Sequence, residues 1–238
     1  MVFDKGEKKV SLYVCGDTHA DIDWGKLAAY RFEKGKKLSK SDYVLVCGDF
    51  GGVWDCGAGD KYIQRWYNSK SWTTLFIDGN HENHDALDAL PVEEWHGGKV
   101  HKVTDSIIHL MRGQIYDIDR RKIFAMGGAD SIDKMYRKKG KSWWSREMPS
   151  EEEYEEALKN VMTAGRVDYV FTHTAPSNVV KRINDSFATD ILTDKLELYS
   201  SLLDFKKWYF GHFHVSIQVD IQDKKFEGLY NEDPIRVW

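Results

Sequence analysis

The sequence predicts an α/β protein, and three observations lead to this fold class. Short apolar runs typical of buried strands occur at residues 11–15, 43–47 and 72–77. Each run is followed within two residues by a glycine and then by a polar residue. These polar residues, Asp17, Asp49 and Asn80, stand 32 and 31 residues apart, about the length of a strand–helix–strand unit. The period predicts three parallel strands whose carboxyl ends lie at one edge of a sheet, where open α/β sheets bind ligands.

The segments that connect these runs are expected to contain helices. Residues 23–33 place Trp24, Leu27 and Arg31 on one face, so a helix is expected there. A shorter helix is expected over residues 60–67, before the third run.

The pattern changes after Asn80. Residues 106–111, 114–118 and 122–126 are short strands separated by turns, which suggests antiparallel hairpins rather than more crossovers. Residues 127–150 have no clear period. A loop of this length in a compact domain is usually functional or mobile, so we expect an active-site loop insertion here.

The last third of the chain predicts two helices and a return to buried strands. Ser150 and Glu153 form a capping box that opens a helix, which Gly165 ends. A buried strand at 167–172 leads to His173, a second helix lies within 189–205, and residues 208–210 lead into hairpin-like strands. No internal repeat, low-complexity tract or linker divides the chain, so we predict a single domain over residues 1–238.

Composition excludes some classes of function. The hydrophobic content of 42% and the charged content of 30% are those of an ordinary globular protein. The net charge of −4 and the pI near 6.1 argue against a dominant nucleic-acid or membrane surface.

Cysteine usage and the amino terminus point to the cytoplasm. Cys15, Cys47 and Cys56 have no close metal-binding spacing, and the first two are expected to be buried free thiols. Residues 1–6 are followed by charge rather than an apolar core, so no signal peptide is expected. No apolar run approaches the roughly 20 residues of a membrane helix.

Five loops that follow strands offer carboxylate, amide or imidazole groups, and none offers a thiolate. They are Gly16-Asp17-Thr18-His19, Gly48-Asp49, Gly79-Asn80-His81-Glu82, His173 and Gly211-His212-Phe213-His214. Such donors suit Mn, Fe, Zn, Co or Ni better than a calcium cage, and we take Mn as the first candidate. There are too many for one tetrahedral ion. A pair of ions about 3.5–4 Å apart, bridged by a carboxylate, fits better and is the usual geometry for phosphoryl transfer.

In these loops the sequence resembles the calcineurin-like metallophosphoesterase superfamily, in the form found in bacteria and phages. The signature of that superfamily is GDxH, GD, GNH followed by Asp or Glu, a lone His, and GHxH. Every element is present here, in order, over residues 16–214. The resemblance implies a four-layer αββα sandwich of two mixed β-sheets flanked by helices.

The resemblance also implies roles for individual residues. One metal ion would be bound by Asp17, His19 and His214, with Asp49 as the bridge, and the second by Asp49, Asn80, His173 and His212. His81 would face the scissile phosphate as the catalytic histidine, stabilising charge or protonating the leaving oxygen. The implied reaction is hydrolysis of phosphomonoesters or phosphodiesters by in-line attack of a metal-bridging hydroxide.

One departure concerns the second motif. The phosphoprotein phosphatase and diadenosine tetraphosphatase branches continue it as GDxVDRG, whereas here residues 50–54 read Phe-Gly-Gly-Val-Trp. The phosphoprotein phosphatase and diadenosine tetraphosphatase activities therefore lose support. The Arg of that motif, which binds the phosphate, is missing. A cation between Lys134 and Arg146 would replace it, and Trp143 or Trp144 would stack on a base. We name Trp144 and Arg146 as candidate substrate contacts, for a small phosphorylated substrate such as a nucleotide.

Other polar residues are expected to have structural roles. The remaining histidines lie outside the signature and are expected to be exposed or to cap helices; they are His84, His96, His101 and His109. Asp78 would either support its turn or orient a ligand, and Glu82 would cap a helix or orient a ligand. The basic run 137–139 is expected to be solvated charge, like the acidic run 151–156 on its helix.

Two further functions remain as alternatives. A non-catalytic metal-binding scaffold would usually have lost ligands, and this chain has lost none that we identify. The acidic net charge and the lack of a long basic stripe argue against a nuclease. The sequence leaves the natural substrate, the metals and the oligomeric state open.

Overall fold

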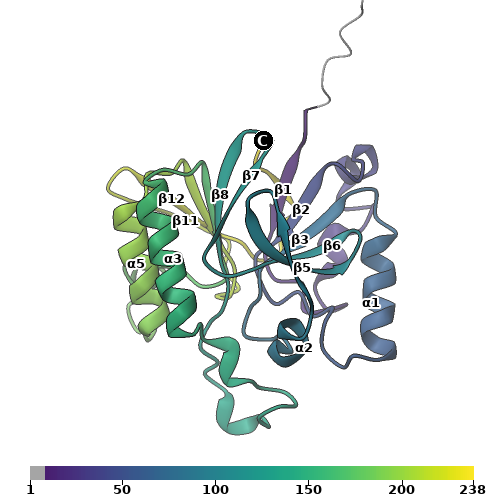
Figure 1. Ribbon diagram of the computed structural model, residues 1–238, viewed down its shortest axis with the longest axis horizontal. Helices are drawn as coiled ribbons and strands as arrows, with labels where there is room; N and C mark the ends of the chain where they lie inside the picture. Colours follow the sequence, from purple (N-terminus) through teal and green to yellow (C-terminus); the bar gives the residue numbers. More distant parts are fainter. Residues whose placement is uncertain (1–8) are drawn as a thin grey trace, which may run out of the picture.

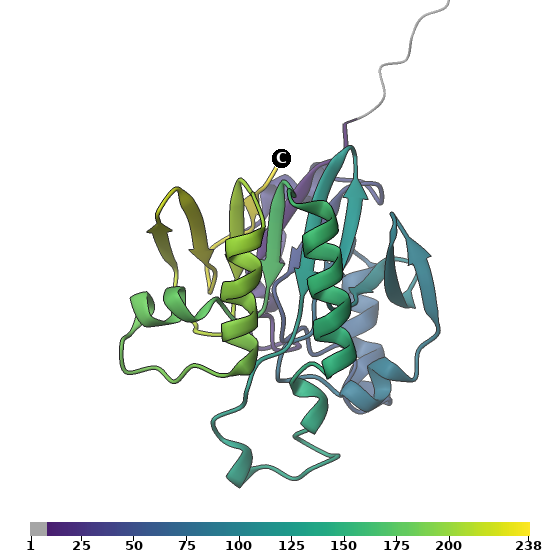
Figure 2. The same ribbon diagram turned by 60° about the vertical axis from the view of Figure 1, so that its left-hand side comes forward.

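The computed structural model describes residues 9–238 and consists of two mixed β-sheets packed face to face, with helices outside them (Figures 1 and 2). One sheet has seven strands in the order β13-β1-β2-β3-β6-β5-β4. The other has six strands in the order β11-β12-β10-β9-β8-β7. This arrangement confirms the predicted four-layer αββα sandwich.

The seven-stranded sheet contains the three parallel strands that the spacing predicted. Leu12 of β1 lies opposite Tyr43 of β2, which lies opposite Thr73 of β3, so the three strands end level with one another. β6 continues the parallel order beside β3, while β13, β5 and β4 run antiparallel to their neighbours. The strands are β1 (Leu12–Cys15), β2 (Tyr43–Val46), β3 (Thr73–Phe76), β4 (Val92–Trp95), β5 (Gly98–Thr104), β6 (Ile107–Leu110) and β13 (Ile235–Arg236).

The six-stranded sheet has a parallel centre and antiparallel edges. β8, β9, β10 and β12 are parallel, and β7 and β11 form hairpins with β8 and β12. Its strands are β7 (Gln114–Ile118), β8 (Arg121–Met126), β9 (Tyr169–Thr172), β10 (Lys207–Phe210), β11 (Ile217–Ile221) and β12 (Lys224–Gly228).

Helices cover the outer faces of both sheets (Figure 1). α1 (Ala58–Asn68) packs on the seven-stranded sheet, and α3 (Glu151–Ala164), α4 (Ser177–Ile183) and α5 (Ile191–Leu202) pack on the other. The short α2 (His84–Asp88) follows β3. The predicted capping box of Ser150 and Glu153 is present, and Gly165 ends α3 in the left-handed conformation.

Three hydrophobic clusters fill the three spaces between the four layers. The middle cluster joins both sheets through residues such as Val14, Leu75 and Phe171. The outer clusters join α1 to the first sheet, with Ile63 and Phe76, and α3 to α5 to the second. Burial on both faces explains why the central strands are mostly apolar.

The helix predicted over residues 23–33 is wrong. The segment forms two 3₁₀ helices instead, η1 (Trp24–Leu27) and η2 (Glu33–Lys37), because Ala28 turns the backbone to an extended conformation. Lys26 is fully buried and donates hydrogen bonds to the carbonyl oxygens of Asp17 and Tyr230. These tertiary contacts outweigh the local helical pattern.

The hairpin predicted from residues 106–118 is also wrong. β6 pairs in parallel with β3, whereas β7 belongs to the other sheet. All four residues of β6 are buried, as in a central parallel strand, and the chain then crosses to the second sheet. β4, β5 and α4 were not predicted, and only the β7–β8 and β11–β12 hairpins are confirmed.

Two further expectations concern the cysteines and membrane-spanning helices. Cys15 and Cys47 are buried free thiols, as predicted, and Cys56 is free and exposed. Within residues 9–238 no helix has the length and apolar character needed to cross a membrane. The expectation about a signal peptide concerns residues 1–6, which lie outside the described part of the chain.

Candidate metal centre

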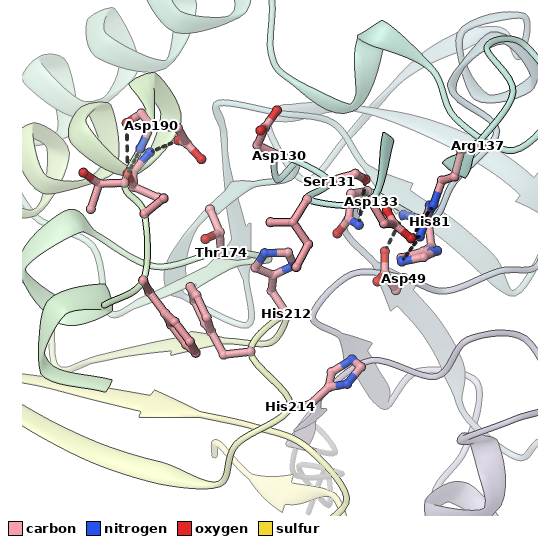
Figure 3. A pocket seen from close by; sticks show the side chains of 17 residues that line it. Asp49, His81, Asp130, Ser131, Asp133, Arg137, Thr174, Asp190, His212 and His214 are labelled. Atoms are coloured by element: carbon pink, nitrogen blue, oxygen red, sulfur yellow. Dashed lines mark hydrogen bonds and ion pairs between the residues drawn. The ribbon is translucent and has the colours of Figure 1, made fainter. Parts of the chain in front are cut away.

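The loops after β1, β2, β3, β9 and β10 meet where the parallel strands of both sheets end. They bring together seven residues that the resemblance assigned to metal binding: Asp17, His19, Asp49, Asn80, His173, His212 and His214. Asp17, Asp49 and His173 are almost completely buried. Figure 3 shows Asp49, His212 and His214 at the wall of a cavity that opens onto this cluster.

One group of potential ligands consists of Asp17, His19 and His214, whose donor atoms all lie within 4.8 Å of one another. His214 Nε2 is 3.2 Å from Asp17 Oδ2. His19 Nε2 is 3.2 Å from Asp49 Oδ2, so Asp49 adjoins this group. These are the four residues that the resemblance assigned to the first ion.

A second group consists of Asp17, Asp49 and His173. His173 Nε2 lies 3.5 Å from Asp49 Oδ1 and 3.1 Å from Asn80 Oδ1. The ring of His212 lies against that of His173, with centroids 5.0 Å apart. Asp17 thus belongs to both groups, whereas the resemblance implied that Asp49 alone bridges.

The backbone is strained at four of these residues. His19, Asp49, His212 and His214 all have positive φ angles, of 43°, 47°, 66° and 50°. Each costs of the order of 1–3 kcal/mol for a residue other than glycine, and such strain concentrates at functional sites. Gly79 permits the close approach of two loops, because a Cβ atom there would lie 2.1 Å from Asp49 Oδ1.

Hydrogen bonds orient the donor groups. The carbonyl oxygen of Cys47 is 2.8 Å from His173 Nδ1, which turns Nε2 of that ring toward the centre. Asp23 Oδ2 does the same for His19, at 2.7 Å from Nδ1. The Asn80 amide donates to Ser131 Oγ at 3.1 Å, which leaves its oxygen facing His173.

Glu82 holds the loop that carries Asp49. It is fully buried and accepts hydrogen bonds from the backbone nitrogens of Phe50, at 2.6 Å, and Gly51, at 3.4 Å. Burial and the nearby charge of Asp49 raise its pKa well above the usual value. Asn83, not Glu82, caps α2 by accepting from the Ala86 nitrogen. Glu82 therefore positions the loop of a ligand.

The carboxylates and histidines of the cluster shift one another's pKa values. Burial opposes a charge on His19, but the carboxylates of Asp49, Asp17 and Asp23 outweigh it and raise the pKa of His19 to about 9. Burial likewise raises the pKa of Asp49, yet the histidines around it, His173 first, hold that pKa far below its usual range. Burial and the proximity of His173 lower the pKa of His212 to about 4.

This donor set fits divalent metal ions. Asp17 and Asp49 are both buried and contribute oxygens to one group, and two buried carboxylates at such a distance favour a bound cation. Carboxylate, amide and imidazole groups without thiolates match Mn²⁺, Fe²⁺, Zn²⁺ and related ions.

The comparison with known families decides the assignment. The sequence model of the calcineurin-like phosphoesterases matches residues 10–216. The chain belongs to the calcineurin-like phosphoesterase family. It is thus a metal-dependent phosphoesterase by family, within the hydrolases. A search of curated proteins found no match.

Solved structures of other proteins resemble this calcineurin-like phosphoesterase at low sequence identity. A putative 5'-nucleotidase from Staphylococcus aureus is 15% identical, with a TM-score of 0.50, over 92% of this chain and 48% of that one. Phosphopantetheinyl hydrolase from Mycobacterium tuberculosis is 14% identical, with a TM-score of 0.46, over 96% of both chains. GAP50 of Plasmodium is 11% identical, with a TM-score of 0.49, over 93% of this chain and 71% of that one. The similarity to the nucleotidase supports the metallo-dependent phosphatase fold.

His81 of the phosphoesterase lines the cavity together with several of the candidate ligands. Its backbone nitrogen donates to Asp49 Oδ1 at 2.7 Å. Its ring lies at the cavity wall, where Arg137 Nη2 donates to Nε2 at 2.9 Å (Figure 3). Burial lowers the pKa of His81, and Arg137 adds to this effect against the opposing charge of Asp49.

Arg137 comes from the 127–150 segment, which projects from the domain in Figures 1 and 2. Its side chain is only 14% exposed and pairs with Asp133 Oδ2 at 2.8 Å. The expectation of solvated charge is therefore wrong for Arg137, because the loop folds it inward over His81. It lies within the range from which we expected a replacement for the missing Arg.

Trp144 and Arg146 have other partners than the cavity. Trp144 is buried, packs edge-on against Trp54 and donates to Asp85 Oδ2 at 2.9 Å. Arg146 pairs with Asp88 at 3.0 Å and with Glu153 at 3.5 Å. In this structure the two residues anchor the base of the loop, and the contacts predicted for them with substrate gain no support.

Three of the four remaining histidines differ from the expectation. His84, His101 and His109 are buried, and only His96 is exposed. The reason is Asp78, whose buried carboxylate accepts hydrogen bonds from Arg112 at 2.6 and 2.8 Å and lies 3.1 Å from His109 Nε2. This network supports the turn that leads to Asn80, which is the first of the two roles open for Asp78.

Proposed function

We propose that this chain is a binuclear metal-dependent phosphoesterase that hydrolyses phosphomonoesters or phosphodiesters by in-line attack on phosphorus. The observation that carries the proposal is that five of the seven candidate donors form two overlapping groups, with Asn80 and His212 beside His173 and with His81 and Arg137 next to them. Two bound divalent ions, Mn²⁺ being the first candidate, would lower the pKa of a water molecule that they share and neutralise charge on the phosphate.

The chain's own donors would divide between the two ions. We assign Asp17, His19 and His214 to one, and Asn80, His173 and His212 to the other, with Asp49 shared. Asn80 is a neutral ligand, so the loaded site keeps positive charge for an anion. The hydrogen bonds of Asp23, Ser131 and Cys47 would hold these donors in place before metal arrives.

His81 and Arg137 would act on the phosphate. A guanidinium offers paired donors that match two phosphate oxygens, so Arg137 would leave His81 and bind the substrate. His81 would then stabilise charge on the phosphate or give a proton to the leaving oxygen. Arg137 thus takes the place of the Arg that the second motif lacks.

The substrate that we propose is small and phosphorylated, with nucleotides among the first compounds to test. The cavity beside His81 has a volume of about 440 Å³, within the range of small-molecule sites. Three free cysteines, one of them exposed, support a reducing compartment such as the cytoplasm.

The test is hydrolysis of p-nitrophenyl phosphate and bis-p-nitrophenyl phosphate by metal-stripped protein reloaded with Mn²⁺. We expect turnover that falls by about 10²–10⁴-fold in His81→Ala and is lost in Asp49→Asn. Asp220→Asn, at an exposed position on β11, is the matched control and should be unchanged. Two bound ions without turnover of either ester would favour the scaffold instead, and strongly salt-dependent DNA or RNA binding would favour a nuclease.

A further inference from the structure

A second cavity, of about 380 Å³, adjoins the candidate metal centre. It is formed by the loop after β1, the loop after β2 and the first half of α1, and His19 lines it. The first cavity is formed by the 127–150 loop, the segment before α5 and the loop after β10. His81 lines both cavities, so both reach the side chain that would face the phosphate.

The wall of the second cavity is mostly apolar. Ile22, Trp54, Tyr62 and Ile63 contribute to it. Ile22 is 79% exposed and Tyr62 is 52% exposed, so large apolar side chains face solvent beside a catalytic site. One acid in this wall, Asp60, already has partners, because it accepts hydrogen bonds from the backbone of Trp54, Asp55 and Cys56 at 2.8, 3.1 and 2.9 Å.

The outer part of the first cavity has the same character. Phe187 and Phe213 are stacked there, with centroids 5.9 Å apart, and Ile132 is 97% exposed. The carboxylates at this wall have partners of their own. Asp130 pairs with Lys134, Asp133 with Arg137, and Asp190 accepts from the backbone nitrogen of Thr193.

We propose that the substrate is a small phosphodiester with an apolar or aromatic group on each side of the phosphate, one group in each cavity. This inference rests on the proposed function and names its substrate class. A phosphomonoester would occupy one cavity and leave the other open to water. A polynucleotide is disfavoured, since the exposed carboxylates of Asp21 and Asp55 line the second cavity and would repel a polyanion.

The reaction consumes one water molecule. Its oxygen forms a new bond to phosphorus, and the bond between phosphorus and one ester oxygen breaks. One proton of the water ends on the released alcohol or phenol, by way of His81, and the other is lost from the monoester product. The group in the second cavity and the group in the first are then on separate molecules.

The experiment measures kcat/KM for bis-p-nitrophenyl phosphate and p-nitrophenyl phosphate with the Mn²⁺-loaded enzyme. We expect at least about a tenfold preference for the diester, and fast release of one nitrophenolate per diester. Tyr62→Ala and Ile22→Glu change exposed side chains, so the fold should survive them. Each should lower kcat/KM for the diester about tenfold, the loss of about 1.4 kcal/mol of binding, and that for the monoester less than about threefold.

Phe187→Ala, which changes the first cavity, should likewise lower kcat/KM for the diester about tenfold and that for the monoester less than about threefold. Tyr30→Ala is the matched control, because Tyr30 is 78% exposed and lines neither cavity, and both esters should be hydrolysed as before. A preference for the monoester, or equal effects of Tyr62→Ala on both esters, would overturn the inference while leaving the phosphoesterase intact. Wild-type protein that hydrolyses neither ester would instead refute the proposed function, and this inference with it.

Discussion

At the scale of one residue, the backbone conformation of Asp49 places its carboxylate among the candidate ligands. Asp49 is buried, has a left-handed backbone, and lies within 3.5 Å of the rings of His19 and His173. Asp49 Oδ1 also accepts a hydrogen bond from the backbone nitrogen of His81. One carboxylate therefore joins both ligand groups to the candidate catalytic histidine, which explains why strain is tolerated here.

Gly79→Ala tests this coupling. A Cβ atom at position 79 would lie 2.1 Å from Asp49 Oδ1 and 2.5 Å from its backbone nitrogen, so the carboxylate must move. We expect Mn²⁺ affinity, measured by isothermal titration, to fall about 10–100-fold. Gly25→Ala, where the nearest atom is an ordinary 3.5 Å away, is the control and should bind as before. Unchanged affinity in Gly79→Ala would show that Asp49 is not a ligand.

Arg137→Ala tests the proposed phosphate contact. Loss of a guanidinium that binds the reacting phosphate should lower kcat/KM by about 10²–10³-fold. Arg137→Lys should recover only part of this, because an ammonium lacks the paired donors. Arg166→Ala, at a side chain that is 70% exposed, is the matched control. Full activity in Arg137→Ala would leave the loop without the role that we give it.

The candidate metal ligands were easier to predict from the sequence than the residues that hold the site in place. The candidate ligands lie in short motifs, or in one case as a single His, directly after strands, so contiguous sequence was enough to propose them. Ser131 and Arg137 act across contacts that join residues 51 and 56 positions apart, and no local pattern marks such pairs. Asp23 lies four residues after His19, and that spacing is the one signal that sequence reasoning missed.

At the scale of elements, the three parallel strands and the capped helix α3 were predictable because their signals are local. The spacing of Asp17, Asp49 and Asn80 reflects equal strand registers. The errors occur where tertiary contacts decide. Buried Lys26 turns the first crossover into 3₁₀ helices, and β6 pairs with β3 and β5 rather than with β7, the next strand in the sequence.

The buried pair of Asp78 and Arg112 anchors the end of β3 and supplies an element-scale prediction. Arg112→Leu leaves the Asp78 carboxylate buried without its partner and should cost about 3–5 kcal/mol, measured by urea unfolding. Burial raises the pKa of Asp78, but Arg112 and then His109 outweigh it and hold that pKa well below the usual value. The stabilisation is therefore present at neutral pH and lost as the pH falls below the ordinary Asp range.

The control for this variant is the double substitution Asp78→Asn with Arg112→Leu. Because it removes the unpaired charge, it should recover part of the stability at pH 7. If Arg112→Leu alone unfolds at the urea concentration of the wild type, the pair does not hold β3 in place.

At the scale of the molecule, one hydrophobic cluster joins the two sheets, and the candidate metal centre lies where the parallel strands of both sheets end. The single domain remains a prediction, and calorimetry tests it together with the metals. We expect one cooperative transition whose calorimetric and van't Hoff enthalpies agree. Mn²⁺ at about 100 times its Kd should add about 2.7 kcal/mol per site, which removal by EDTA reverses. Two resolved transitions would contradict the single domain.

The measurement that tests the central claim most directly is a titration of metal-stripped protein with Mn²⁺, followed by bound ions per chain and by hydrolysis of bis-p-nitrophenyl phosphate. The account predicts two ions per chain, with activity that rises fully only as the second one binds. Asn80→Ala, which removes a donor beside His173, should retain one ion and lose turnover. Full activity at one ion per chain, or turnover that persists without metal, would contradict a binuclear mechanism.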